Sequence, residues 1–175
     1  WYYDDYSKEL DKAGYLEEYR RLLWDPENGK VFPFPGPAEW HPDAWVGDHA
    51  AQYLKDNEPG SSPLFAWISF SGPHYPFDTP AEYYERVNQD GLPARSYMEG
   101  EFTDESRIHY KSFYGGGHID GCGLAPMHAC RNYTEEYWKK LQTSYYANVA
   151  LIDDEVGKIL EQVQDKYGDN VMVIF

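Results

Sequence analysis

The sequence lacks a long hydrophobic run, and it is poor in basic residues and in cysteine. None of its apolar stretches approaches the roughly 20 residues that a membrane-spanning helix needs, and no signal peptide is recognisable. Only 15 Lys and Arg residues stand against 30 Asp and Glu residues in a chain of 175, so the formal net charge is −15. Such an excess of carboxylates argues against a nucleic-acid partner or an anionic membrane surface, although a local cluster of donors can still hold a small anion.

The two cysteines, Cys122 and Cys130, are compatible with a disulfide, two free thiols or metal ligands, and their number does not fix the redox compartment. Together with His118 and His128 they have the residue types of a zinc site. Their spacing matches no standard zinc pattern, however, and glycines separate them. We therefore expect a disulfide or free thiols rather than zinc.

What the sequence does contain is a short apolar run, residues 64–70, that ends abruptly in Ser-Gly-Pro. A nearly continuous apolar run bounded by turn formers predicts a buried strand with both faces covered, as in a parallel sheet. His74 follows at once, on a turn stiffened by Pro73 and Pro76, whose φ angles are fixed. Because ligands of open α/β sheets bind beyond the carboxyl ends of the strands, His74 is the best candidate for chemistry in the chain.

Apolar periodicity predicts helices in four parts of the chain. They cover residues 1–24, 42–55, 81–87 and 134–166. The last helix has Thr134 as its N-cap and leads through a Gly-Asp-Asn turn into a second apolar run, residues 171–175, which we predict to be a strand. An α-to-β unit of this kind packs on a parallel sheet, so the predicted fold class is α/β.

Two stretches are predicted to be irregular. Residues 25–42 are broken by prolines, and we expect their aromatic side chains Phe32, Phe34 and Trp40 to pin a loop to the body of the protein rather than to line a pocket. Residues 88–132 hold most of the glycines, and we expect them to form an insertion or a substrate loop.

Asp153 and Asp154 invite an acid–base or metal interpretation because they are adjacent carboxylates. Neighbouring side chains on a helix of 3.6 residues per turn point about 100° apart, so the two do not converge. We expect them to be solvated or to pack against another helix.

Three segments, taken together, resemble the sulfatases. Residues 45–54 and 63–70 are similar to a helix and the following strand of that family, and Pro73-His74-Tyr75-Pro76-Phe77 matches its Pro-His-x-Pro-Phe turn. Residues 145–160 resemble the long helix before the family's metal-binding strand end. The resemblance spans residues 45–175, apart from 88–132. It implies an alkaline-phosphatase-like fold, with a mostly parallel sheet that is covered by helices and incomplete in this chain, and it implies hydrolysis of sulfate monoesters.

The resemblance also implies cofactors that this chain is not expected to carry. In sulfatases a Cys or Ser in a Cys/Ser-x-Pro-x-Arg motif becomes formylglycine, and a divalent cation, usually Ca²⁺, holds the sulfate oxygens. Neither Cys122 nor Cys130 lies in such a motif. The metal ligands of the family fall near its N-terminus and after the strand at 171–175. We therefore expect residues 1–175 to be a single internal segment of a sulfatase-like catalytic domain, without metal ligands and inactive by itself.

Of the family's active-site set, only His74 carries over to this sequence. An imidazole exchanges a proton near neutral pH, so it can donate a hydrogen bond to sulfate or a proton to the departing oxygen. A structural histidine that caps the turn is the alternative. Within 88–132, Arg107, His109, Lys111 and His118 are candidates for lining the substrate pocket. The expected substrate is a small-molecule or carbohydrate sulfate ester.

Two other functions remain open from the sequence. A phosphomonoester, phosphodiester or phosphonate-ester hydrolase can share the same scaffold, and a Thr or Ser nucleophile with a two-metal site would indicate it. A non-enzymatic carbohydrate-binding module could use the 17 tyrosines and 6 tryptophans, and a full-length sequence without metal-binding aspartates would favour it.

Overall fold

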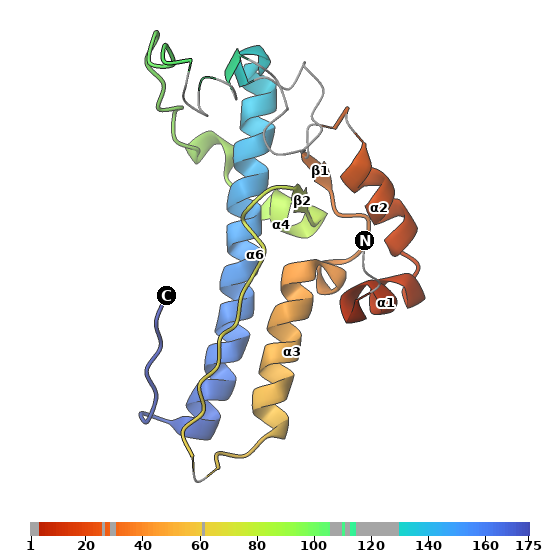
Figure 1. Cartoon of the computed structure of the whole chain (residues 1–175), viewed down its shortest axis with the longest axis vertical. Helices are drawn as coiled ribbons and strands as arrows, with labels where there is room; N and C mark the ends of the chain where they lie inside the picture. Colours follow the sequence, from red (N-terminus) through yellow and green to blue (C-terminus); the bar gives the residue numbers. More distant parts are fainter. Residues whose placement is uncertain are drawn as a thin grey trace.

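The computed structural model describes residues 4–25, 27–28, 31–60, 62–105, 110, 113–114 and 130–175. It is a mixed α/β structure in which helices dominate (Figure 1). The α-helices are α1 (Asp5–Lys12), α2 (Leu16–Trp24), α3 (Pro42–Asp56), α4 (Ala81–Arg86) and α6 (Glu135–Tyr167). The strands are β1 (Val31–Pro33) and β2 (Phe77–Thr79), and the 3₁₀ helices are η1 (Ala38–Trp40), η2 (Gln89–Gly91) and η5 (Cys130–Asn132). None of the helices in these ranges is both long and apolar enough to cross a membrane.

Helix α6 is the longest element, and with its 33 residues it confirms the helix predicted over 134–166. The Thr134 hydroxyl caps it by accepting a hydrogen bond from the backbone N–H of Tyr137 at 3.1 Å. Helix α3, which confirms the prediction over 42–55, packs along α6 and runs in the same direction (Figure 1). Leu151 of α6 is fully buried against Ala44 of α3. Strands β1 and β2 and helix α4 contact α6, and η1 contacts α3, so the helix pair links the other elements.

The N-terminal region forms two helices, so the single helix predicted over 1–24 is wrong. The Asp4 carboxylate caps α1 by accepting the backbone N–H of Ser7 at 2.7 Å. The chain then turns at Gly14, where φ is +85°, before α2 begins. The apolar periodicity hides this break because Leu10 of α1 and Leu16 of α2 are buried in the same cluster on either side of the turn.

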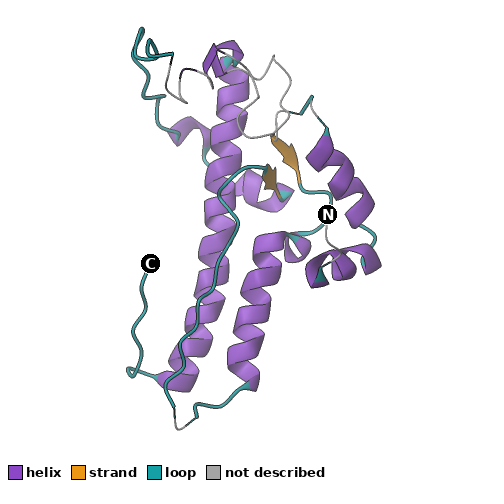
Figure 2. Ribbon diagram, viewed as in Figure 1, coloured by secondary structure: helices purple, strands orange, loops and turns teal. Residues whose placement is uncertain are grey.

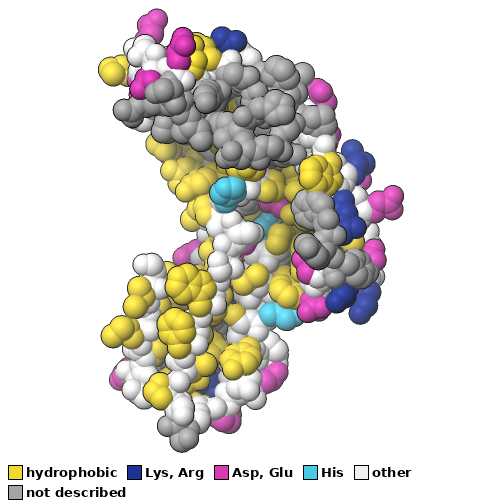
Figure 3. All heavy atoms as spheres, in the orientation of Figure 1, with side chains coloured by type: hydrophobic (Ala, Val, Ile, Leu, Met, Phe, Trp, Pro, Cys, Tyr) yellow, Lys and Arg dark blue, Asp and Glu magenta, His cyan; other side chains and the backbone are white. Residues whose placement is uncertain are grey.

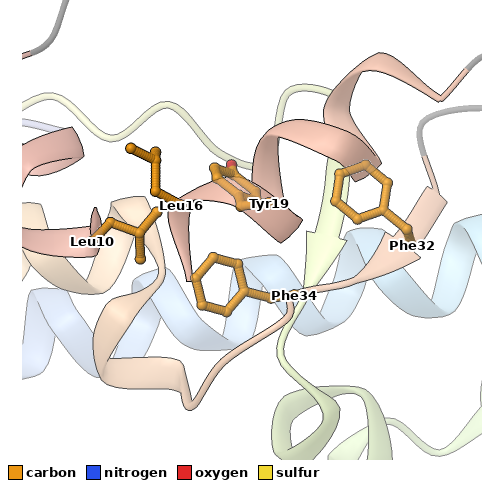
Figure 4. Close-up of a cluster of buried hydrophobic side chains, with 5 residues drawn as sticks. All are labelled: Leu10, Leu16, Tyr19, Phe32 and Phe34. Atoms are coloured by element: carbon orange, nitrogen blue, oxygen red, sulfur yellow. The ribbon is translucent and has the colours of Figure 1, made fainter. Parts of the chain in front are cut away.

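The two strands form a small parallel sheet (Figure 2). The register pairs Val31 with Phe77, Phe32 with Asp78 and Pro33 with Thr79. Strand β1 lies within 25–42, where only a loop was predicted. It was missed because a strand of three residues that ends in proline is too short to show an alternating pattern. Phe32 and Phe34 are buried with Leu10, Leu16 and Tyr19 (Figure 4), and Trp40 packs against this cluster. The aromatic side chains therefore pin this stretch to the body of the protein, as predicted.

The two apolar runs predicted to be buried strands, 64–70 and 171–175, are not strands in this structure. Phe65 and Trp67 are 85% and 83% exposed, and Phe175 is 93% exposed. Hydrophobic side chains accordingly gather on the part of the surface over which these two segments run (Figure 3). A strand needs a neighbour that supplies hydrogen bonds and a layer that covers its faces. The prediction of strands at 64–70 and 171–175 is therefore wrong for this structure, because composition alone could not supply those neighbours.

Helix α4 confirms the short helix predicted over 81–87. Beyond it, residues 88–105 contain the 3₁₀ turn η2 and otherwise neither helix nor strand. Most of 106–129 lies outside the described residues. The role of 88–132 as an insertion or a substrate loop stays a prediction.

Gly47 of α3 marks the closest approach of α3 to α6. A Cβ placed at Gly47 would lie 2.4 Å from Oε2 and 2.6 Å from Cβ of Glu155 on α6. We expect Gly47→Ala to force the helices apart and to cost about 1–3 kcal/mol of stability. Gly157→Ala is the matched control, because a Cβ there meets nothing within 4 Å. That variant is expected to gain about 0.5–1 kcal/mol through helix propensity alone. Chemical denaturation of the full-length protein measures both, and equal effects of the two substitutions would contradict the close contact.

Glu155 is a buried carboxylate in this helix pair, and it predicts a pH effect. Lys158 Nζ donates a hydrogen bond to Glu155 Oε1 at 2.8 Å, whereas Oε2 has no hydrogen-bond partner in the described part of the chain. Burial raises the pKa of the Glu155 carboxyl above its usual value, and Lys158 offsets this only in part. The unfolded chain therefore loses this proton at lower pH than the folded chain, and stability falls as pH rises through that interval.

Replacing Glu155 by glutamine removes this ionisation. We expect the difference in Tm between Glu155→Gln and the wild type to shift in favour of the variant as the pH rises from about 4 to 7. Glu161→Gln, at an exposed position on the same helix, is the control. A Tm difference that stays constant over this pH range would refute the buried ionisation.

Candidate active site

His74 lies on the turn that precedes β2, and its side chain is exposed. Its Nδ1 donates a hydrogen bond to the backbone carbonyl of Tyr75 at 2.7 Å, and the two rings lie against each other with centroids 4.3 Å apart. Because a carbonyl can only accept, this bond fixes a proton on Nδ1. Nε2 has no hydrogen-bond partner among the described residues, so it is the atom that a substrate can reach.

A buried carboxylate holds the start of this turn. Asp43, in the first turn of α3, is only 1% exposed. Its Oδ1 accepts hydrogen bonds from the backbone N–H of Ser71 at 2.8 Å, from the Ser71 hydroxyl at 3.1 Å and from the backbone N–H of Gly72 at 3.1 Å. The helix dipole of α3 also favours a negative charge at this end. The turn is therefore tied to the N-terminus of α3 two residues before His74.

A second buried carboxylate holds the other end of the turn. Asp78, in β2, accepts a hydrogen bond from the Tyr19 hydroxyl of α2 at 2.5 Å. Burial, together with the Asp78 carboxylate, raises the pKa of the Tyr19 hydroxyl far above its usual range, so Tyr19 stays protonated and is the donor in this bond. The bond joins α2 to the sheet four residues after His74.

His41 connects the two carboxylates. Its ring is buried, and Nδ1 accepts the backbone N–H of Asp43 at 3.2 Å, which caps α3. Nδ1 therefore carries no proton, whereas the buried Nε2 lies 3.4 Å from Asp78 Oδ1 and makes no hydrogen bond in the described part of the chain. The chain of contacts thus runs from Tyr19 through Asp78 and His41 to Asp43 and the turn.

Sequence reasoning missed this network. The available signal was His41-Pro42-Asp43, in which a polar residue precedes a proline and an acidic residue at a predicted helix start. That pattern indicates a helix cap, and it says nothing of the contact between Asp43 and Ser71, 28 residues away along the chain.

The adjacent pair Asp153 and Asp154 behaves as predicted. Asp153 is exposed, and Asp154 contacts α4 by accepting hydrogen bonds from Arg86 Nη1 at 2.6 Å and from the Tyr83 hydroxyl at 2.9 Å. The Arg86 guanidinium lowers the pKa of Asp154. Partial burial and the Asp154 carboxylate raise the pKa of Tyr83 to about 12. Asp154 is therefore a helix-packing residue.

The candidate pocket residues of the 88–132 region, Arg107, His109, Lys111 and His118, lie outside the described residues, as do Cys122 and His128. His118 as a substrate-binding residue therefore stays a prediction. Cys130 is described and carries a free thiol, whose pKa is raised by burial. Of the possibilities left open for the cysteines, the structure therefore favours a free thiol for Cys130.

No group of three His, Cys, Asp or Glu side chains within the described ranges is arranged to hold a metal ion. Two of the surface cavities formed by described residues have volumes of about 430 and 310 Å³, and His74 lines neither of these two. The larger is bordered by α4 and the start of α6 and the smaller by α3 and α6. The candidate site is thus an exposed turn with a buried foundation, not an enclosed pocket.

The chain is thus a mixed α/β structure with a small parallel sheet. Because 64–70 is not a strand, His74 lies before the amino end of β2 and not, as the sequence predicted, beyond the carboxyl end of a strand. A family model described as Sulfatase matches residues 1–175, and the chain belongs to the sulfatase family.

Several curated relatives of this chain are named as sulfatases. An arylsulfatase of Clostridium perfringens is 23% identical over 175 residues, which is 98% of this chain and 33% of that protein. The iduronate 2-sulfatase of Homo sapiens is 25% identical over 149 residues, 76% of this chain and 24% of that protein. A sulfatase of Formosa agariphila is 22% identical over 136 residues, 75% of this chain and 25% of that protein. The chain therefore spans at most about a third of the length of these relatives.

Proposed function

We propose that the protein to which this chain belongs hydrolyses sulfate monoesters and that His74 contacts the ester. The observation that carries the proposal is the exposed imidazole on a turn anchored at both ends, within a chain whose whole length matches the sulfatase family. The named activities of its relatives, an arylsulfatase and an iduronate 2-sulfatase, support a small-molecule or carbohydrate sulfate ester as substrate.

The chemistry assigned to His74 follows from its two nitrogens. Nδ1 donates to the Tyr75 carbonyl and holds the ring in place. In the imidazolium form Nε2 also carries a proton, and it can donate this proton to the bridging oxygen as the sulfur–oxygen bond breaks. The leaving group then departs as a neutral alcohol, the sulfuryl group ends as sulfate with an oxygen from water, and the proton released from that water restores the imidazolium through solvent. A donor aimed at the developing charge is the largest contribution that a single side chain makes in sites of this kind.

Sulfatases in general use a divalent metal ion and formylglycine. The described residues of this chain do not fit either group, because they include no cluster of three metal-binding side chains, and neither cysteine lies in a Cys-x-Pro-x-Arg motif. We propose that Ca²⁺ and formylglycine are held by residues outside this chain. The contribution of this chain is the positioned imidazole.

The test is to measure hydrolysis of 4-nitrophenyl sulfate and 4-nitrophenyl phosphate by the full-length protein. We expect a higher kcat/KM for the sulfate. A higher value for the phosphate would overturn the proposal and favour the phosphoester hydrolase on the same scaffold. A disaccharide carrying an iduronate 2-sulfate group, assayed in parallel, separates aryl from carbohydrate esters as the preferred substrate class.

A further inference from the structure

The turn that carries His74 has a firm base and an exposed tip. Ser71 and Gly72, at its start, bind the Asp43 carboxylate through two backbone N–H groups and one hydroxyl. Asp43 is 1% exposed, whereas His74 and Tyr75 are exposed. A buried carboxylate that accepts several hydrogen bonds is held in one geometry, because any displacement would leave a charge and its donors unpaired in a low-dielectric environment.

The fit at Gly72 is tight. A Cβ placed on Gly72 would lie 2.4 Å from Asp43 Oδ2 and 3.0 Å from Ile152 Cδ1 of α6. The backbone of the turn is thus seated between the start of α3 and the middle of α6. Only a residue without a side chain allows this approach.

The contacts of Asp43 extend to the far end of the turn. Its backbone N–H donates to His41 Nδ1 at 3.2 Å, and His41 Nε2 lies 3.4 Å from Asp78 Oδ1. Asp78 in turn is paired with β1 through the sheet and with Tyr19 through its hydroxyl. Both ends of the eight-residue stretch from Ser71 to Asp78 are therefore anchored to the same buried group of side chains, Tyr19, His41, Asp43 and Asp78.

We propose that Asp43 is a positioning residue, which holds the His74 turn against the start of α3 and so sets the location of the imidazole relative to the substrate. This inference rests on the proposed function for its catalytic consequence. Asp43 itself does not touch the ester, because it is buried and its oxygens are occupied by the turn. A misplacement of a catalytic group by about 1 Å can cost on the order of 100-fold in rate.

Two perturbations of opposite kind test the proposal in the full-length protein. Asp43→Asn keeps the shape of the side chain but removes the charge that accepts the backbone N–H groups. Gly72→Ala keeps the Asp43 carboxylate but pushes the turn away from it. Asp153→Asn, on the exposed face of α6, and Gly60→Ala, where a Cβ meets only the Ser62 nitrogen at 3.9 Å, are the matched controls.

The first readout is amide hydrogen exchange of the peptide that covers residues 71–77, which needs no enzymatic activity. We expect faster exchange in Asp43→Asn and Gly72→Ala, unchanged exchange in α6, and no change in either control. Wild-type exchange rates for 71–77 in both variants would overturn the proposal, whatever the activity of the protein.

The second readout is kinetic. We expect Asp43→Asn and Gly72→Ala to lower kcat for 4-nitrophenyl sulfate by roughly 10- to 100-fold with a smaller change in KM. In a His74→Ala background the same substitutions should lower kcat by less than about twofold, because the group that they position is gone. Equal losses in both backgrounds would assign Asp43 a general structural role and overturn the positioning role. A wild-type protein without sulfate-ester hydrolysis would refute the proposed function, and the exchange experiment would still decide whether Asp43 holds the turn.

Discussion

Replacing His74 by alanine in the full-length protein is expected to lower kcat for an aryl sulfate by roughly 100- to 1,000-fold, which corresponds to about 2.7–4 kcal/mol of transition-state stabilisation. The physical reason is that Nε2, the ring nitrogen left open by the bond from Nδ1 to the Tyr75 carbonyl, would no longer supply a donor to the departing oxygen. His74→Gln separates two parts of this role, because glutamine donates a hydrogen bond but cannot transfer a proton. We expect its kcat to lie between those of the wild type and the alanine variant.

The stability of His74→Ala should match that of the wild type, because the side chain is exposed and its one hydrogen bond is local. This separates a loss of chemistry from a loss of folding. His49→Ala is the matched control, since His49 is an exposed histidine on α3 that contacts Trp45. Turnover is compared per metal-loaded molecule in all variants. Unchanged turnover in His74→Ala would remove this residue from the mechanism and leave it as a turn-capping side chain.

The helices were the part of the fold that the sequence made predictable. In α6 the apolar side chains recur every three or four residues over 33 positions, and a cap precedes them. So long a pattern leaves little ambiguity between helix and strand. At the N-terminus the same signal failed to register the turn at Gly14, because the buried side chains on both sides of the turn serve one cluster.

The strands were less predictable because a strand depends on its neighbours. Residues 64–70 and 171–175 have the composition of interior strands, but no described segment pairs with them. The sheet that does form joins two three-residue segments, 46 positions apart at their first pair, Val31 and Phe77. Neither is long enough for alternation to be visible.

In the candidate site, too, local sequence features were predictable and contacts between distant residues were not. His74 could be selected from its local setting, because a histidine between two prolines at the end of an apolar run is unusual in the chain. The carboxylates that hold its turn could not be selected in this way. Asp43 reads as a helix-start residue and Asp78 as an acidic residue after a turn, and their function depends on contacts with Ser71 and Tyr19 that only the folded chain creates.

Asp78 therefore provides a large stability prediction for the network that holds the turn. Replacing it by alanine removes the acceptor of the Tyr19 hydroxyl and the carboxylate next to His41 Nε2. The Tyr19 hydroxyl is buried, and a buried donor that loses its partner costs about 1–3 kcal/mol, whereas His41 Nε2 makes no hydrogen bond to Asp78 in the wild type. We expect Asp78→Ala to lower the free energy of unfolding by about 1–3 kcal/mol, measured by chemical denaturation of the full-length protein. The exposed Asp153→Ala serves as the control and should change it by less than about 0.5 kcal/mol.

Tyr19→Phe tests whether this cost arises from the network or from Asp78 alone. The single change removes the hydroxyl donor and should cost about 1–3 kcal/mol, since it leaves one oxygen of a buried carboxylate without its hydrogen bond. Combined with Asp78→Ala it should cost clearly less than the sum of the two single changes, because the two groups lose the same bond. Full additivity would show that Tyr19 and Asp78 act independently, and a cost below about 1 kcal/mol for Asp78→Ala would show that water replaces the carboxylate. If the network holds as described, Asp78→Ala should also speed amide exchange in residues 71–77, since the turn would then be anchored through Asp43 alone.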